Sequence, residues 1–112
     1  MAQPKPIAFR GSSLEDLRAF PLSARREAGH QLDKVQKGRE PDDWKPMHSV
    51  GQGVQEIRIR DATGIYRVMF VARFAEAVYV LHCFQKKTQK TRKADLDIAG
   101  QRYRDLLKEI RS

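Results

Sequence analysis

Residues 79–91 read Tyr-Val-Leu-His-Cys-Phe-Gln-Lys-Lys-Thr-Gln-Lys-Thr, an apolar run that passes without glycine or proline into a lysine-rich segment. Apolar runs of this kind are typical of strands buried within a sheet. Because nothing interrupts the chain between the strand and the lysines, we expect Lys86 and Lys87 to be held at the edge of that sheet. The stretch therefore predicts one strand of the fold and the place where positive charge gathers.

Two strand-like runs precede this stretch and predict a meander. Residues 54–60 alternate in polarity, so that Glu56 and Arg58 share one face of their strand. Residues 65–74 are mainly apolar, with Arg67 as a charge inside the run. The Asp-Ala-Thr-Gly sequence between the two runs has the residues that a hairpin turn requires.

The remainder of the chain shows helical spacing and loop residues. Serine capping and apolar periodicity predict helices over residues 12–20 and 22–37, and a third helix that begins within residues 91–95. A short edge strand is expected at residues 7–9, and proline and glycine predict a loop over residues 39–53.

With the last strand at residues 78–84, the predicted order is β-α-α-β-β-β-α. We therefore predict an α+β fold in which a small antiparallel sheet packs against helices. The length predicts a single domain over residues 1–112.

The charge of the chain is uneven. Net charge is +8, and residues 54–112 carry 13 Lys/Arg against 7 Asp/Glu, whereas residues 1–53 carry 9 against 7. This excess favours a polyanionic partner such as RNA, DNA or an acidic protein, the alternative being a basic surface without a partner. No apolar run approaches the roughly 20 residues of a membrane span. The N-terminus lacks the apolar core of a signal peptide, and the single cysteine, Cys83, suits a reducing compartment, so we expect a cytoplasmic protein.

Arg67 is the residue that most needs an explanation, because a guanidinium within a sheet is costly unless something pairs with it. Glu56 on the neighbouring strand is one possible partner. The other possibility is an open site that binds an anion, and a phosphodiester matches the guanidinium fork well. Both interpretations remain open from the residues alone. Trp44 likewise either anchors its loop to the core or stacks on a base or partner.

A metal site is not expected. The histidines His30, His48 and His82 are scattered, and no Cys/His/Asp spacing is typical of metal ligands.

Several segments resemble a known family. Glu-Ile-Arg-Ile-Arg at residues 56–60, Gly-Ile-Tyr-Arg-Val-Met-Phe at 64–70 and the stretch at 79–88 resemble the HigB-like, phage-derived branch of the RelE/ParE type II toxin superfamily. Residues 84–91 are the most specific part, and Trp-Lys-Pro-Met at 44–47 also agrees. The resemblance extends over residues 7–107 and implies a RelE/ParE-like fold.

The resemblance implies that the protein is the toxin of a toxin–antitoxin system. HigB and RelE relatives cleave mRNA on the ribosome without a metal or other cofactor, and a small helix-turn-helix antitoxin neutralises them. ParE-like relatives on the same fold inhibit DNA gyrase instead. A third possibility is a phage-derived basic RNA-binding module that has lost activity.

The resemblance also implies roles for individual residues in an attack by the ribose 2′-OH. Arg67 would bind the scissile phosphate, and Arg58 lies where relatives have a basic residue on the preceding strand. Lys87 or Lys86 would stabilise or protonate the leaving 5′-oxygen. The flanking backbone would be held by Arg60, Lys90, Arg92 and Lys93.

The general base has no clear counterpart in the family pattern. The tyrosine that some relatives use has no match, because Tyr103 lies on the apolar side of its helix. Glu56 and His82 are the remaining candidates. Strand alternation groups His82 with Val80 and Phe84, which favours a buried structural histidine.

Overall fold

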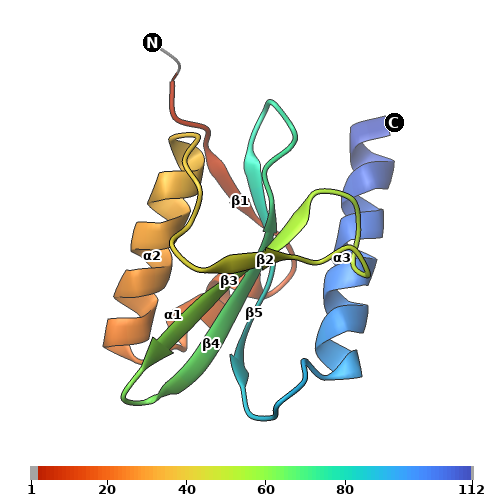
Figure 1. Cartoon of the computed structure of the whole chain (residues 1–112). Helices are drawn as coiled ribbons and strands as arrows, with labels where there is room; N and C mark the ends of the chain where they lie inside the picture. The colour runs from red at the N-terminus through yellow and green to blue at the C-terminus, as the bar shows by residue number, and fades with distance from the viewer. Residues whose placement is uncertain (1–2, 112) are drawn as a thin grey trace.

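The computed structural model describes residues 3–111 of the chain, which form a five-stranded mixed sheet packed against three helices (Figure 1). The elements in chain order are β1 (Ile7–Phe9), α1 (Ser13–Arg18), α2 (Leu22–Gln36), β2 (Trp44–Pro46), β3 (Val54–Asp61), β4 (Gly64–Val71), β5 (Val78–Lys86) and α3 (Lys93–Arg111). The strands lie in the order β1-β5-β4-β3-β2. The α+β prediction is confirmed, and the arrangement is compatible with a RelE-like fold.

Two details of the sheet differ from the prediction of an antiparallel sheet in the order β-α-α-β-β-β-α. β1 is parallel to β5, because the chain passes through α1 and α2 before it returns to the sheet and β1 is left to pair with the last strand. The predicted loop over residues 39–53 contains β2, whose three residues pair with β3 at the edge of the sheet. A strand this short has no alternation that sequence could reveal.

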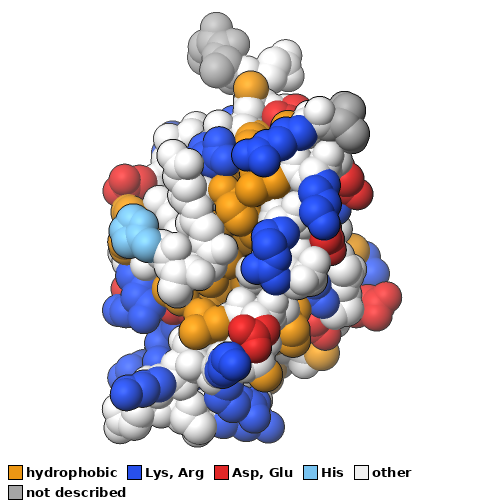
Figure 2. All heavy atoms as spheres, turned by 90° about the vertical axis from the view of Figure 1, so that its right-hand side faces the viewer, with side chains coloured by type: hydrophobic (Ala, Val, Ile, Leu, Met, Phe, Trp, Pro, Cys, Tyr) orange, Lys and Arg blue, Asp and Glu red, His pale blue; other side chains and the backbone are white. Residues whose placement is uncertain are grey.

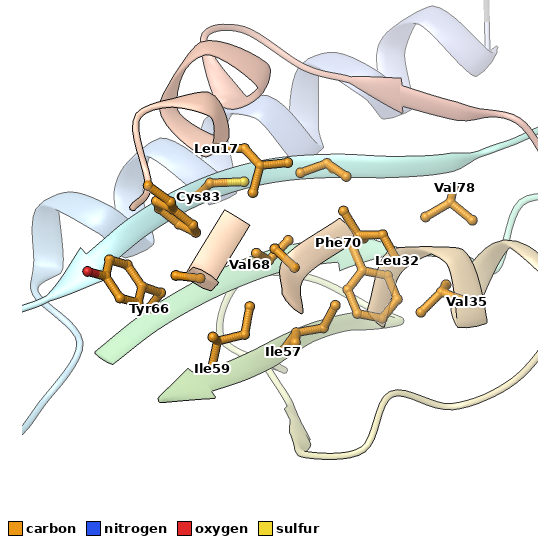
Figure 3. Close-up of a cluster of buried hydrophobic side chains, with 14 residues drawn as sticks. Leu17, Leu32, Val35, Ile57, Ile59, Tyr66, Val68, Phe70, Val78 and Cys83 are labelled. Atoms are coloured by element: carbon orange, nitrogen blue, oxygen red, sulfur yellow. The ribbon is translucent and has the colours of Figure 1, made fainter. Parts of the chain in front are cut away.

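The helices cover opposite faces of the sheet. On one face, residues of α1 and α2 such as Leu17, Leu32 and Val35 pack on Ile57 and Phe70 of the strands (Figure 3). On the other face, Tyr103 and Leu106 of α3 pack with Met69, Val71 and Leu81. Burial on both faces explains why β4 is apolar at successive positions.

A β-bulge in β5 decides which of its later residues face α3. Met69 pairs with His82, but the next residue, Phe70, pairs with Val80, so that Leu81 is an extra residue in the strand. Its carbonyl oxygen accepts a hydrogen bond of 2.9 Å from Nη1 of Arg102 on α3. Side chains beyond the bulge therefore change face relative to a regular strand.

The ends of the strands also differ from the prediction. β4 ends at Val71 instead of residue 74, and β5 continues through Lys86. Among residues 3–111, no helix is both long and apolar enough to cross a membrane.

Candidate functional site

Charged side chains from four strands meet on the face of the sheet that α3 covers only in part. Glu56 and Arg58 lie on β3, Arg67 on β4, Lys86 on β5 and Lys45 on β2. In the sheet register, Arg58 lies directly opposite Arg67, and Lys45 lies opposite Glu56. Pairing of antiparallel strands thus brings together residues that are far apart in the sequence.

Glu56 is the buried centre of this group, with none of its surface exposed. Its Oε1 atom lies 3.3 Å from Nε of Arg67 and 3.9 Å from Nζ of Lys45. Neither carboxylate oxygen has a hydrogen-bond partner within the described chain. Burial raises the pKa of Glu56, and the cations of Lys45, Arg67, Lys86 and Arg58 oppose that rise.

Arg67 is also buried, with 7% of its surface exposed. Its Nη1 donates a hydrogen bond of 3.2 Å to the carbonyl of Tyr66, while its Nε has no aligned acceptor in residues 3–111. Burial lowers the pKa of Arg67, and Glu56 acts in the opposite direction. The ion pair with Glu56, one of the two interpretations left open by the sequence, is present, but it leaves Nε of Arg67 without a hydrogen bond in the described chain. The binding of an anion by Arg67 stays a prediction.

Arg58 adds a second guanidinium next to the first. Like charges directly opposite each other on neighbouring strands are unfavourable. Arg58 has one weak counter-charge, since its Nη1 lies 4.0 Å from Oδ1 of Asp43, and its Nε is buried without a hydrogen-bond partner among the described residues. A bound anion would relieve the repulsion between Arg58 and Arg67.

A pocket of about 420 Å³ opens beside these residues. It is lined by Arg60, Ile65, Arg67, Lys86, Lys87, Thr88 and Gln89, so that its titratable groups are all cationic. Figure 2 shows Lys and Arg side chains gathered at the lower end of the molecule, the end at which Figure 1 places the segment between β5 and α3. Burial lowers the pKa of Lys86, and Arg67 adds to that effect. The pocket is suited to a phosphate group.

His82 is not part of this pocket. Its Nε2 lies 2.8 Å from Oδ1 of Asp95, and its ring stacks on Phe84 with 5.0 Å between ring centroids. The side chain is buried, but the grouping with Val80 was wrong, because the bulge places Val80 in the core under α1 and α2 and Phe84 on the α3 side. Met69 lies between His82 and Glu56 in the sheet register.

The remaining basic residues lie at different distances from the site. Arg60 lines the pocket, and Lys90 is exposed just beyond it in the segment that leads to α3. Arg92 faces Asp95, with 3.9 Å between Nε and Oδ2, and Lys93 lines a separate hollow beside α3. The structure thus brings together the strand cations, while Arg92 and Lys93 belong to the start of α3.

The other side chains considered from the sequence lie outside the pocket. Tyr103 is buried, as its apolar spacing predicted. Its hydroxyl donates a hydrogen bond of 2.7 Å to the carbonyl of Gln52. Cys83 is buried, and desolvation raises its pKa to about 12. Trp44 is half-buried on β2, and His48 is exposed. No cluster of metal-ligating side chains occurs in residues 3–111.

Lys45 is the site residue that sequence reasoning missed. In the sequence it belongs to the Trp-Lys-Pro-Met segment, and no charge pattern links it to Glu56. The link exists because β2 pairs with β3, which a segment with two prolines nearby does not predict.

Comparison with known proteins identifies a family. The model of the family described as "Phage derived protein Gp49-like (DUF891)" matches residues 15–104, well over half of the chain. No curated protein matches the chain significantly.

Proposed function

We propose that this chain, which belongs to the phage-derived Gp49-like family of RelE/HigB-type toxins, is a HigB-like endoribonuclease that cleaves mRNA on the ribosome without a metal. The observation that carries the proposal is the ion pair of the buried Glu56 with Arg67, which itself lines a pocket whose charged groups are all cationic. A carboxylate can accept a proton there while guanidinium and ammonium groups hold a phosphate.

The reaction would proceed by transfer within the RNA chain. Glu56 accepts the proton of the ribose 2′-OH as the 2′-oxygen attacks the adjacent phosphorus. Arg67 and Arg58 bind the non-bridging oxygens, whose negative charge increases in the transition state. Lys86 or Lys87 donates a proton to the leaving 5′-oxygen. The products are a 2′,3′-cyclic phosphate and a free 5′-OH, and DNA is not cut because it has no 2′-OH.

Two features of the site support this division of roles. A raised pKa makes Glu56 a stronger base than an ordinary carboxylate, and a lowered pKa makes Lys86 a better proton donor. Glu56 has no exposed surface, so neighbouring side chains have to move before the 2′-OH reaches its carboxylate. That requirement is consistent with cleavage on the ribosome, which holds the mRNA in place.

The test replaces Arg67 and follows both growth and RNA. Induction of the unaltered chain is expected to arrest growth and to produce cut sites in cellular mRNA that primer extension detects. Arg67→Ala should reduce cleavage by about 10²-fold or more, while circular dichroism shows an unchanged fold. Arg26→Ala, an exposed arginine on α2, is the matched control and should cleave normally.

Other outcomes would redirect the assignment. Growth arrest that persists in Arg67→Ala contradicts the proposed site. Double-strand breaks in DNA without mRNA cleavage would indicate a gyrase inhibitor, and the absence of both effects would indicate an inactive basic RNA-binding module.

We also propose a cytoplasmic, single-domain toxin with a helix-turn-helix antitoxin that covers the basic pocket. The residues that would contact that partner are the exposed cations of the segment between β5 and α3, Lys87 and Lys90 among them. A small helix-turn-helix protein in the neighbouring reading frame would support this pairing, and co-expression should restore growth.

A further inference from the structure

Lys45 differs from the other cations around Glu56 in what else it can contact. The charged groups that face Glu56 are Lys45 from β2, Arg58 from β3, Arg67 from β4 and Lys86 from β5. Arg67 and Lys86 line the pocket, and Arg58 lies opposite Arg67. Lys45 is absent from the pocket lining and lies 3.9 Å from Oε1 of Glu56.

The two oxygens of Glu56 are not equivalent. The ion pairs of Lys45 and Arg67 both involve Oε1, at 3.9 and 3.3 Å. Within residues 3–111, Oε2 has neither an ion pair nor a hydrogen bond. Oε2 is buried, but as the oxygen without an ion pair it has the lone pairs to accept a proton from a substrate once the side chains around it move.

Binding of RNA changes the balance among these cations. A phosphate in the pocket attracts Arg67 and Lys86, which line it, and brings further negative charge close to Glu56. The carboxylate would then be neutralised by protonation unless another cation remains beside it. Two cations form ion pairs with Glu56, Lys45 and Arg67, and of these Lys45 does not line the pocket. Lys45 reaches Glu56 from the outer edge of the sheet.

We propose that Lys45 is a positioning residue for the general base: its ammonium keeps Glu56 ionised when RNA is bound and holds Oε1, so that Oε2 is free for the 2′-OH. This inference rests on the proposed function, because it assigns Lys45 a role through Glu56. It does not require Lys45 to contact RNA.

The decisive measurement is the titration of the Glu56 carboxyl in the purified protein, followed by carbon-detected NMR, in the unaltered chain and in Lys45→Met. Methionine keeps the length of the side chain and removes its charge. Removal of a neighbouring cation disfavours the carboxylate, so Glu56 should titrate at a higher pH in Lys45→Met. Lys45→Arg should restore the original titration, and Lys108→Met, which removes an exposed lysine from α3, should leave it unchanged.

The same variants are then compared in mRNA cleavage across a range of pH. For Lys45→Met, cleavage should fall about tenfold at pH values below the Glu56 pKa for each unit by which that pKa rises. It should recover toward the rate of the unaltered chain at high pH, where the carboxyl is ionised in both proteins. A side chain that merely held β2 in place would lower the rate at every pH.

Each outcome decides a separate point. An unchanged Glu56 titration in Lys45→Met, or a loss of cleavage that is the same at all pH values, overturns the role of Lys45. If Lys45→Met does not fold by circular dichroism, Lys45→Gln replaces it in the same titration with the same expected shift. Failure of the unaltered chain to cleave mRNA overturns the proposed function and leaves the titration result standing.

Discussion

At the scale of single residues, the site combines groups that a protein core normally keeps apart. Glu56 and Arg67 are both buried, and Arg58 lies opposite Arg67 in the register. The ion pair between Nε of Arg67 and Oε1 of Glu56, at 3.3 Å, compensates only part of the cost of burial, because the carboxylate has no hydrogen bond within the described residues. A phosphate that binds to the guanidinium groups would offset the remaining cost of burying them, which favours its binding.

The substitution Glu56→Gln tests the cost of burying this carboxylate through the pH dependence of the free energy of unfolding. Burial raises the pKa of Glu56 above its ordinary value of 4.5, so the folded protein binds this proton more tightly than the unfolded chain. That contribution to stability is greatest below the unfolded pKa and is lost as pH rises through the folded pKa. The free energy of unfolding of Glu56→Gln should therefore rise relative to the unaltered chain over this interval.

The expected gain is about 1.4 kcal/mol for each pH unit that separates the two pKa values. Urea unfolding at a series of pH values measures it. A difference that falls as pH rises would mean that the four cations outweigh burial and that the pKa of Glu56 is depressed. The same variant should lose cleavage, since glutamine cannot accept the proton.

At the scale of elements, the β5 bulge and the short β2 strand assemble the site. The bulge at Leu81 places Phe84 and Lys86 on the face of Arg67, and Arg102 from α3 binds the Leu81 carbonyl. β2 brings Lys45 opposite Glu56. The connection from β2 to β3 packs against α3, because Tyr103 donates its hydroxyl to the Gln52 carbonyl.

Two glycines with different surroundings should respond in opposite ways to substitution by alanine. A Cβ atom at Gly51 would overlap the ring of Tyr103, which is buried and cannot move away freely. Gly51→Ala should therefore lower the free energy of unfolding by about 1–3 kcal/mol. Gly29→Ala, in α2 with no atom near the new methyl group, should raise it by about 0.5–1 kcal/mol.

Thermal or urea unfolding distinguishes the two variants. Equal stability of Gly51→Ala and the unaltered chain would show that the connection between β2 and β3 can move away from α3. Destabilisation by Gly29→Ala would contradict the open surroundings of that glycine.

At the scale of the whole molecule, the distribution of unpaired positive charge matters more than the total of +8. Two cations at the C-terminal end of α2 are neutralised locally, since Lys34 pairs with Asp42 and Lys37, the residue after the helix, pairs with Asp33. Lys86 and Lys87 form no ion pair with any residue of the described chain and line the pocket. Positive charge without an ion pair therefore lies at the end of the sheet where the pocket opens.

This asymmetry predicts how RNA binding depends on salt. Affinity for a single-stranded RNA should fall as salt rises, because bound phosphates release counterions. The double variant Lys86→Gln, Lys87→Gln should bind more weakly and reduce the steepness of log K against log salt by about 1.4, which is about 0.7 for each lost contact to a single strand. The control Lys34→Gln, Lys37→Gln removes the same charge from the C-terminal end of α2 and should change the slope little. Equal effects of both pairs would contradict a localised site.

The sequence by itself determined the α+β class, the helices, the meander and the gathering of cations on its strands. These features follow from local periodicity, from turn residues such as Asp61 and Gly64, and from alternation along β3. Glu56, Arg58 and Arg67 could be assigned to one face because β3 and β4 are regular. The family match over residues 15–104 agrees with the toxin-type resemblance.

Tertiary structure alone decided which of these groups meet. Regular alternation from Val80 would have turned Lys86 to the opposite face, and the bulge at Leu81, held by Arg102, reverses that direction. Lys45 reaches Glu56 only because β3 offers an edge to a strand too short to have a pattern of its own. Both outcomes depend on hydrogen bonds between segments distant in sequence, which local residue patterns do not encode.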